Sequence, residues 1–336
     1  MLNDYNYAAH PCVLDAVLEA STRRFSGYGA DEECAEAAGL IRGLIGMADA
    51  EVHFMIGGTQ TNLTAIGAFL RPHEAVIAPA AAHINVHETG AIEAIGHKIL
   101  AFPAGDGKAR ADDIHAIMEL HSNEHMVKPK LLFISQATEF GTVYTRTELL
   151  ALREACDRYG LFLYIDGARL GCALTSDACD IELSDLAGIA DAFYIGGTKN
   201  GLLFGEALVI RDKVLAQEFR YHMKQRGALL AKGFLLGLQF RAILKDGIYF
   251  DLARHANRAA TSLDMGLRQR GVSLLIDTVS NQVFPYVSDD VLSRLEEQVL
   301  FEIWDSKGEN GTPVRFVTTW QTTDAEIDAV LRCFEK

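Results

Sequence analysis

Two polar residues, each placed just after an apolar stretch, are the first candidates for chemistry in this sequence. The apolar stretch 161–165 runs into Asp166, and the stretch 192–195 runs through two glycines and a threonine into Lys199. Ligands of open α/β sheets bind outside the carboxyl ends of the strands, so we expect both side chains at one site. A lysine that forms a Schiff base, together with an aspartate that keeps a proton on a pyridine nitrogen, is the pair that pyridoxal 5'-phosphate (PLP) chemistry requires.

Each residue also has a simpler interpretation. Most lysines are exposed on loops, and Asp166-Gly167 is a common turn pair. The combination of Lys199 with Asp166, rather than either residue alone, favours the cofactor.

An earlier glycine-containing turn predicts a phosphate site. An apolar stretch leads into Gly57-Gly58-Thr59, after which a helix is expected. Backbone N–H groups at a helix start, together with a hydroxyl, form an anion cradle. The Gly-x4-Gly-Lys pattern of a P-loop is missing. Ahead of Asp166 and Lys199, Gly58 and Thr59 are therefore predicted to hold the phosphate of PLP.

Two histidines and an arginine are further candidates. His83 and His87 have i, i+4 spacing and would share one face of a helix. We predict no metal site, because His-Glu-x-x-His and an obvious third ligand are missing. His83 is predicted to stack on the pyridine ring and His87 to act as a general acid or base, an ordinary helix-face histidine being the alternative. Arg169 suits the α-carboxylate of an amino acid, a surface ion pair being its alternative.

Composition excludes several classes of protein. The chain has 336 residues, 49% hydrophobic and 23% charged, with a net charge of -14. This charge disfavours nucleic-acid binding, which needs a basic stripe. No apolar run approaches the ~20 residues that span a membrane. The first residues lack the basic start and apolar stretch of a signal peptide, so we expect a cytoplasmic protein with reduced cysteines.

The order of elements predicts an α/β fold. Apolar segments alternate with helical ones, which is typical of a mostly parallel sheet covered by helices on both faces. The expected strands are 52–56, 75–78, 98–102, 131–135, 161–165, 192–195 and 207–210. A helical region over 212–245, interrupted at Gly227 and Gly233, and a long helix over 249–270 should follow.

The last part of the chain is expected to form a small α+β domain. Its expected strands are 272–276, 282–287 and 314–318, and its expected helices are 289–299 and 324–334. The predicted division is an N-terminal arm and helix over 1–25, a large PLP-binding domain over 26–246 and a small domain over 247–336.

Together these motifs resemble the threonine aldolase / β-eliminating lyase family of fold-type I PLP enzymes, over nearly the whole chain. The matching positions are Asp-Gly-Ala-Arg at 166–169, the Gly58-Thr59 phosphate turn, the ring-stacking His83, the Schiff-base Lys199 and Arg315, a second carboxylate-binding arginine. The resemblance implies a fold-type I PLP-dependent transferase-like fold, with a seven-stranded mostly parallel sheet and a smaller C-terminal α+β domain.

The chain departs from the family pattern around Lys199, at Glu139 and at Asn3, and the departure at Glu139 leaves the general base open. Around Lys199 the sequence is Gly-Gly-Thr-Lys-Asn-Gly, where many members have Ser-Lys-Gly. Glu139 stands where many members have a histidine that is a proposed base, and Asn3 stands where they have a serine that contacts the substrate. Some bacterial low-specificity aldolases look like this sequence around Glu139 and Lys199, so activity is expected. The base candidates are His87, Glu139 or a water held by His83.

The resemblance implies retro-aldol cleavage of a β-hydroxy-α-amino acid, such as threonine or allo-threonine, to glycine and an aldehyde. Arg169 and Arg315 would hold the carboxylate of this small-molecule substrate. It also implies a homo-oligomer, a dimer or tetramer, with active sites at a subunit interface. The alternatives are another PLP-dependent β-eliminating lyase or an aminotransferase, a non-catalytic PLP-binding protein, and an α/β module without a cofactor.

Overall fold

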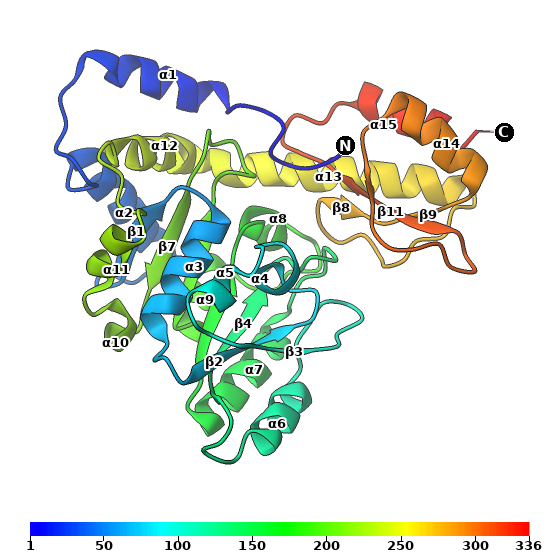
Figure 1. Cartoon of the computed structure of the whole chain (residues 1–336). Coiled ribbons are helices and arrows are strands. Elements are labelled where there is room, and N and C mark those ends of the chain that lie inside the picture. Colours follow the sequence, from blue (N-terminus) through cyan, green and yellow to red (C-terminus); the bar gives the residue numbers. More distant parts are fainter. Residues whose placement is uncertain (336) are drawn as a thin grey trace.

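The computed structural model describes residues 1–335 and contains one large and one small sheet (Figure 1). The large sheet has seven strands in the order β1-β7-β6-β5-β4-β2-β3. The strands are β1 Glu51–Met55, β2 Glu74–Pro79, β3 Ile99–Phe102, β4 Lys128–Ser135, β5 Phe162–Asp166, β6 Ala192–Gly196 and β7 Glu206–Ile210. Only β7 is antiparallel to its neighbours, so the expected seven-stranded, mostly parallel sheet is confirmed.

Helices cover both faces of this sheet (Figure 1). They are α1 Pro11–Glu19, α2 Glu32–Ile45, α3 Gly58–Phe69, α4 His83–Val86, α5 Ala91–Ala94, α6 Ala111–Leu120, α7 Arg146–Tyr159, α8 Leu170–Leu174, α9 Leu183–Ile189, α10 Lys213–Ala216, α11 Phe219–Gln225 and α12 Phe234–Leu244, with 3-10 turns η1 Ala20–Thr22 and η2 Lys245–Gly247. None of the helices in residues 1–335 is long and apolar enough to cross a bilayer.

A hydrophobic core lies on each face of the large sheet, and the side chains of β4 contribute to both cores. Leu132 and Ile134 point to the core beneath α2, α7, α9 and α12, whereas Leu131 and Phe133 point to the core beneath α3 and α11. Side chains of a strand alternate between the two faces of a sheet. A strand covered on both faces therefore has a continuously apolar sequence, which is why the strands of the large sheet could be recognised from the sequence.

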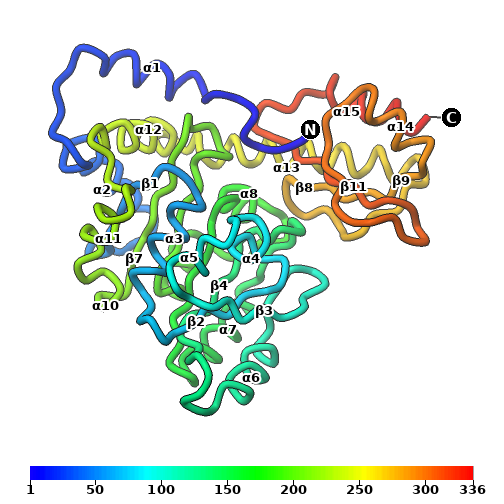
Figure 2. Tube along the Cα trace, viewed as in Figure 1, coloured from blue at the N-terminus to red at the C-terminus, as the bar shows by residue number. Residues whose placement is uncertain are grey.

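The last part of the chain builds the small sheet around the far end of α13, Ile248–Gln269, which runs from one sheet to the other (Figures 1 and 2). Its other elements are β8 Gln282–Val283, β9 Tyr286–Val287, α14 Asp289–Gln298, β10 Glu302–Ile303, β11 Thr312–Val317 and α15 Asp324–Arg332. The first residues of the chain lie here too, since Val317 N donates to Met1 O at 2.9 Å. The proposed division at residues 25 and 246 stays a prediction.

The structure corrects the sequence-based elements in two places. The strand expected over 272–276 is wrong, because only an isolated bridge joins Leu274 to Pro285. The strand expected over 282–287 is split into β8 and β9, with Pro285 between them. Proline has no N–H to donate, so a regular ladder is interrupted at that position. The helical region over 212–245 has the expected breaks and one more at Glu218, whose φ is 56°.

Two glycines bring the carboxyl ends of β5 and β6 together. Gly196 N donates to Gly167 O at 3.0 Å. A Cβ atom on Gly167 would lie 1.7 Å from Tyr194 O, and one on Gly196 would lie 2.6 Å from Gly167 O. No side chain larger than hydrogen fits at either position, and this close approach brings Asp166 and Lys199 to the same edge of the sheet.

We expect Gly167→Ala to lower the free energy of unfolding by about 1–3 kcal/mol or more, because the added methyl group overlaps the backbone of β6. Urea denaturation would measure the change. Gly188→Ala is the matched control, since Gly188 lies in the exposed part of α9 with no atom within 4 Å of its Cβ position. The control should be neutral or stabilising by up to about 1 kcal/mol. Equal stability of the Gly167→Ala protein and the wild type would refute the close-packing argument.

Candidate active site

Two adjoining cavities lie at the carboxyl edge of the large sheet. The smaller has a volume of about 310 Å³ and includes Gly58, Thr59 and Asp166 in its lining. The larger has a volume of about 650 Å³ and includes Asn3 and Arg315. The lining residues that both cavities share are Tyr5, His83, His87, Glu139, Arg169 and Lys199. The structure thus brings all of the predicted site residues to one place.

Lys199 is partly exposed to both cavities and lies between two charged neighbours. Burial lowers the pKa of the Lys199 amine, and the positive charge of Arg169 lowers it further. A lowered pKa increases the neutral, nucleophilic fraction of an amine. Glu206, which sequence reasoning missed, accepts a hydrogen bond from Gly197 N at 3.0 Å and lines the smaller cavity. Burial raises the pKa of Glu206 to about 8.

Asp166 is 4% exposed and is held by three donors. Tyr194 Oη donates to Asp166 Oδ1 at 2.5 Å, Ala168 N donates to the same oxygen at 2.9 Å, and Asn62 Nδ2 donates to Oδ2 at 3.0 Å. Burial, followed by the charge of Asp166, raises the pKa of Tyr194, so this hydroxyl remains a donor. The contacts fix the orientation of the carboxyl group, and no pattern in the sequence pointed to Asn62 or Tyr194 as its partners.

His83 begins α4, a single helical turn, and His87 follows its last residue. Their ring centroids are 5.4 Å apart, so they share a face as predicted. His83 N and Ser135 Oγ both donate to Glu139 Oε1, at 2.9 and 2.8 Å. Burial raises the pKa of Glu139. Burial, with the neighbouring His83 adding to it, lowers the pKa of His87, which favours a neutral ring able to accept a proton.

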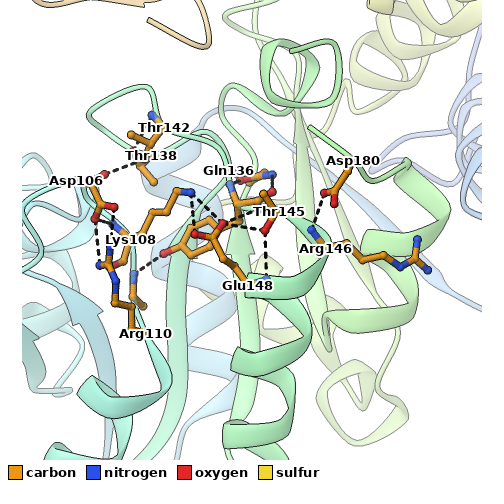
Figure 3. A network of polar contacts seen from close by, with 12 residues as sticks. Asp106, Lys108, Arg110, Gln136, Thr138, Thr142, Thr145, Arg146, Glu148 and Asp180 are labelled. Carbon is orange, nitrogen blue, oxygen red and sulfur yellow. Dashed lines mark hydrogen bonds and ion pairs between the residues drawn. The ribbon is translucent and has the colours of Figure 1, made fainter. Parts of the chain in front are cut away.

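Hydrogen bonds between the two sides of the loop hold the segment around Glu139 in place. Figure 3 labels Gln136, Thr138 and Thr142 of this network. Gln136 Nε2 donates to Tyr144 O at 3.1 Å, and Tyr144 N donates to Gln136 Oε1 at 2.9 Å. The Thr138 and Thr142 hydroxyl oxygens lie 2.7 Å apart. These bonds close the loop on itself and hold Glu139 against α4.

Arg169 is 10% exposed and already has a carboxylate partner. Its Nε donates to Asp4 Oδ2 at 2.7 Å, and its Nη2 donates to Asp4 Oδ1 at 3.1 Å. Asn281 Nδ2 also donates to Asp4 Oδ2, at 3.0 Å. Burial alone would raise the pKa of Asp4, but the Arg169 charge outweighs it and the pKa is lowered. Asp4, which was not predicted as a site residue, therefore sets the position of Arg169.

Arg315 reaches the larger cavity from β11 and retains a free donor. Its guanidinium pairs with Glu302, which lies directly opposite on β10, and its Nη1 donates to Gln282 Oε1 at 3.3 Å. Within residues 1–335 its Nε is buried without a partner. An orphaned donor of this kind is satisfied by a ligand carboxylate. Asn3 lies nearby in the lining, with its Oδ1 accepting from Tyr5 N at 3.1 Å.

The donor set of the smaller cavity fits PLP. The first N–H groups of a helix have no partner inside it, so the start of α3 at Gly58 and Thr59 offers donors to a phosphate. A Cβ on Gly58 would lie 3.1 Å from Tyr194 Oη, so glycine keeps this cradle open. Asp166 supplies a carboxyl group for a ring nitrogen, and Lys199 supplies an amine.

Known proteins share both the sequence pattern and the fold. The family model described as beta-eliminating lyase matches residues 13–290. The chain is 35% identical over 321 residues to the low specificity L-threonine aldolase of Pseudomonas aeruginosa, covering 94% of this chain and 91% of that protein. The low specificity L-threonine aldolase of Escherichia coli is 27% identical over 249 residues, covering 73% of this chain and 72% of the relative.

Solved structures also show this similarity. A threonine aldolase structure from Leishmania major superposes with a TM-score of 0.97 at 44% identity, covering 99% of this chain and 97% of that one. An aspartate aminotransferase from Thermus thermophilus has a TM-score of 0.73 at 15% identity, covering 98% and 88%. The second likeness shows the fold alone, and it confirms the expected fold class.

We expect Asp4→Asn to lower the free energy of unfolding by about 3–5 kcal/mol at pH 7, because it leaves the buried Arg169 charge without its partner. The folded pKa of Asp4 lies below its ordinary value of 3.8. The stabilisation is therefore complete above pH 3.8 and is lost as the pH falls through the folded pKa. Urea denaturation at several pH values would test whether the variant and the wild type converge on the acid side.

Asp49→Asn is the matched control, since the exposed Asp49–Lys213 pair is 3.0 Å long and should contribute nothing measurable. A loss of stability from Asp4→Asn that is no larger than that from Asp49→Asn would contradict the importance of the buried pair.

Proposed function

The chain belongs to the beta-eliminating lyase family, and on that premise we propose that it cleaves threonine, allo-threonine or a related β-hydroxy-α-amino acid to glycine and an aldehyde, using PLP. It is a lyase of the threonine aldolase type. The observation that carries the proposal beyond family membership is the shared cavity. An amine with a lowered pKa, Lys199, lines the same small cavity as Asp166 and the donors at the start of α3.

PLP would be held by the residues that line the smaller cavity. The N–H groups of Gly58 and Thr59 would bind its phosphate, and His83 would pack against its ring. Asp166, oriented by its three donors, would accept a hydrogen bond from the protonated ring nitrogen and keep the proton there, and Lys199 would attach the aldehyde carbon through its amine. When bound, PLP withdraws the electron pair that is released at the substrate Cα.

The substrate carboxylate would bind in the larger cavity. Arg315 offers its orphaned Nε, and Arg169, which Asp4 holds in place, offers positive charge beside it. Asn3 lines the same cavity and is proposed as a further substrate contact. Fixing the carboxylate restricts the orientation of the Cα–Cβ bond, and holding the bond in the productive orientation lowers the entropic cost of cleavage.

Cleavage requires a proton acceptor for the β-hydroxyl group. The electron pair of the O–H bond forms the C=O bond of the aldehyde, the Cα–Cβ pair passes to Cα, and Cα then takes up a proton to give glycine. His87, Glu139 or a water held by His83 are the candidates. His87 is favoured because its lowered pKa keeps it neutral, whereas burial favours the protonated form of Glu139.

The proposal includes a homo-oligomer, a dimer or tetramer with active sites shared between subunits. Large apolar side chains are exposed on α1 and α2, among them Leu14, Leu18, Leu40 and Leu44. Exposed apolar side chains of this size are of the kind that a subunit interface would cover.

An aminotransferase is the second candidate, since proteins of that activity share the fold. Product analysis separates the two: glycine with an aldehyde indicates an aldolase, ammonia with pyruvate indicates another β-eliminating lyase, and a keto acid indicates an aminotransferase. L-threonine, L-allo-threonine and phenylserine would serve as test substrates for the purified protein.

We expect Lys199→Ala to release no glycine from any of these substrates and to lose the visible absorption of bound PLP, because the attaching amine is gone. Amino-acid analysis and absorption spectroscopy would measure both effects. Lys213→Ala is the control, since the Lys213 side chain is 81% exposed on α10 and should leave both readings unchanged. Undiminished glycine release by the Lys199→Ala protein would sink the proposed function.

We expect His87→Ala to lower kcat by about 10²–10⁴-fold, as loss of a general base typically does, and Glu139→Gln to lower it less. The pKa of His87 lies below its ordinary 6.5, so the ring should be neutral above that lowered value. The wild-type kcat should accordingly stay high down to below pH 6.5 and fall only as His87 becomes protonated. Steady-state assays across this pH range would show it, and a larger effect of Glu139→Gln would transfer the role of base to Glu139.

A further inference from the structure

Glu88 is a buried carboxyl group beside the site to which no role has been given. It lies two residues after the end of α4, and its side chain is 0% exposed. Glu88 Oε1 lies 2.7 Å from His83 Nδ1 and accepts a hydrogen bond from Asn62 Nδ2 at 2.9 Å. Its Oε2 is buried and has no partner within residues 1–335. A carboxyl group buried at this cost, with its bonding concentrated on one oxygen, indicates a specific task for that oxygen.

Asn62 connects Glu88 to the carboxyl group of Asp166. Its Nδ2 donates both hydrogens, one to Glu88 Oε1 and one to Asp166 Oδ2 at 3.0 Å, and its Oδ1 accepts from Tyr164 Oη at 3.0 Å. Burial raises the pKa of Tyr164 well above its usual value, so this hydroxyl stays a donor. The opposite orientation of the amide would set its oxygen against two carboxyl oxygens. Asn62 therefore keeps both carboxyl oxygens as acceptors.

The arrangement fixes which nitrogen of His83 bears a proton. Because Glu88 Oε1 acts as an acceptor, the Nδ1 atom of His83 is the donor in the bond between them. In the neutral form of the ring, His83 Nε2 is then the acceptor nitrogen, and His83 lines both cavities. A buried carboxylate that orients an imidazole in this way sets its tautomer and stabilises the positive charge that forms when the ring accepts a proton.

We propose that Glu88 is a positioning residue that acts through His83, holding the ring with its proton on Nδ1 so that Nε2 accepts a hydrogen bond from a water or from the substrate hydroxyl. Asn62 donates separately to Glu88 Oε1 and to Asp166 Oδ2, and Asp166 keeps its other donors, so Glu88 acts on the reaction through His83 alone. The inference rests on the proposed function, because it assigns Glu88 a part in the same reaction.

Glu88→Gln tests the role, because it keeps the shape of the side chain and removes its charge. We expect kcat to fall about 10–100-fold, as loss of a second-layer partner typically causes, with KM and the PLP dissociation constant unchanged within about 2-fold. Glu93→Gln is the matched control, since Glu93 is an exposed acid on the neighbouring α5 and should behave as the wild type. Glu88→Gln and Glu93→Gln having equal kcat would overturn the proposal.

A double-mutant cycle separates this role from a merely structural one. In a His83→Asn background, Glu88→Gln should cause no further loss of kcat, because Glu88 acts only through the ring that is already gone. Independent, multiplying losses from the two changes would overturn the proposal.

Neutron diffraction of the wild-type holoenzyme gives a direct reading that does not depend on activity or on the folding of a variant. Nuclear density for the exchangeable hydrogen should appear on His83 Nδ1 and not on Nε2, and finding it on Nε2, alone or together with Nδ1, would overturn the proposal. This reading also distinguishes the two hypotheses. A wild-type protein that releases no glycine and aldehyde refutes the proposed function, while the proton position still decides the relation of Glu88 to His83.

Discussion

The burial of charge at one edge of a sheet is the constraint on which this site depends. Removing a carboxylate or guanidinium from water costs several kcal/mol unless partners replace the lost hydration. Asp166 has three donors, Arg169 has both oxygens of Asp4, and Glu88 has two donors on one oxygen. Each charge therefore requires a partner in a defined place, and the result is a set of side chains with little freedom to move.

The backbone meets this constraint by bringing adjacent strands unusually close at their ends. Gly167 and Gly196 allow it, because the space that a Cβ would need is occupied by the opposing backbone. The hydrogen bonds between Gln136 and Tyr144 close the loop after β4 and so fix the position of Glu139 as well. Positions fixed by backbone contacts hold catalytic groups more accurately than long flexible side chains alone, and this pre-organisation is what lowers a reaction barrier.

The sequence predicted the features whose signals are local. Asp166 and Lys199 were found because each ends an apolar strand, and the seven strands were found because burial on both faces makes them continuously apolar. Asn62 and Tyr194 could not be found in this way. Each is a common residue in a regular element, and its partner Asp166 lies 104 or 28 positions away, so only the folded chain brings them together. Glu218 likewise interrupts a helix with a positive φ that no turn residue announces.

The path of the first four residues has a consequence for how the protein is made. Asp4 is translated long before its partner Asn281 and before β11, the strand that Met1 joins. Until then Arg169 lacks the carboxylate that neutralises it, and the N-terminal segment has no surface on which to dock. The nascent chain thus carries an incomplete site through most of its synthesis, and the site is completed only when the two distant segments of the polypeptide meet.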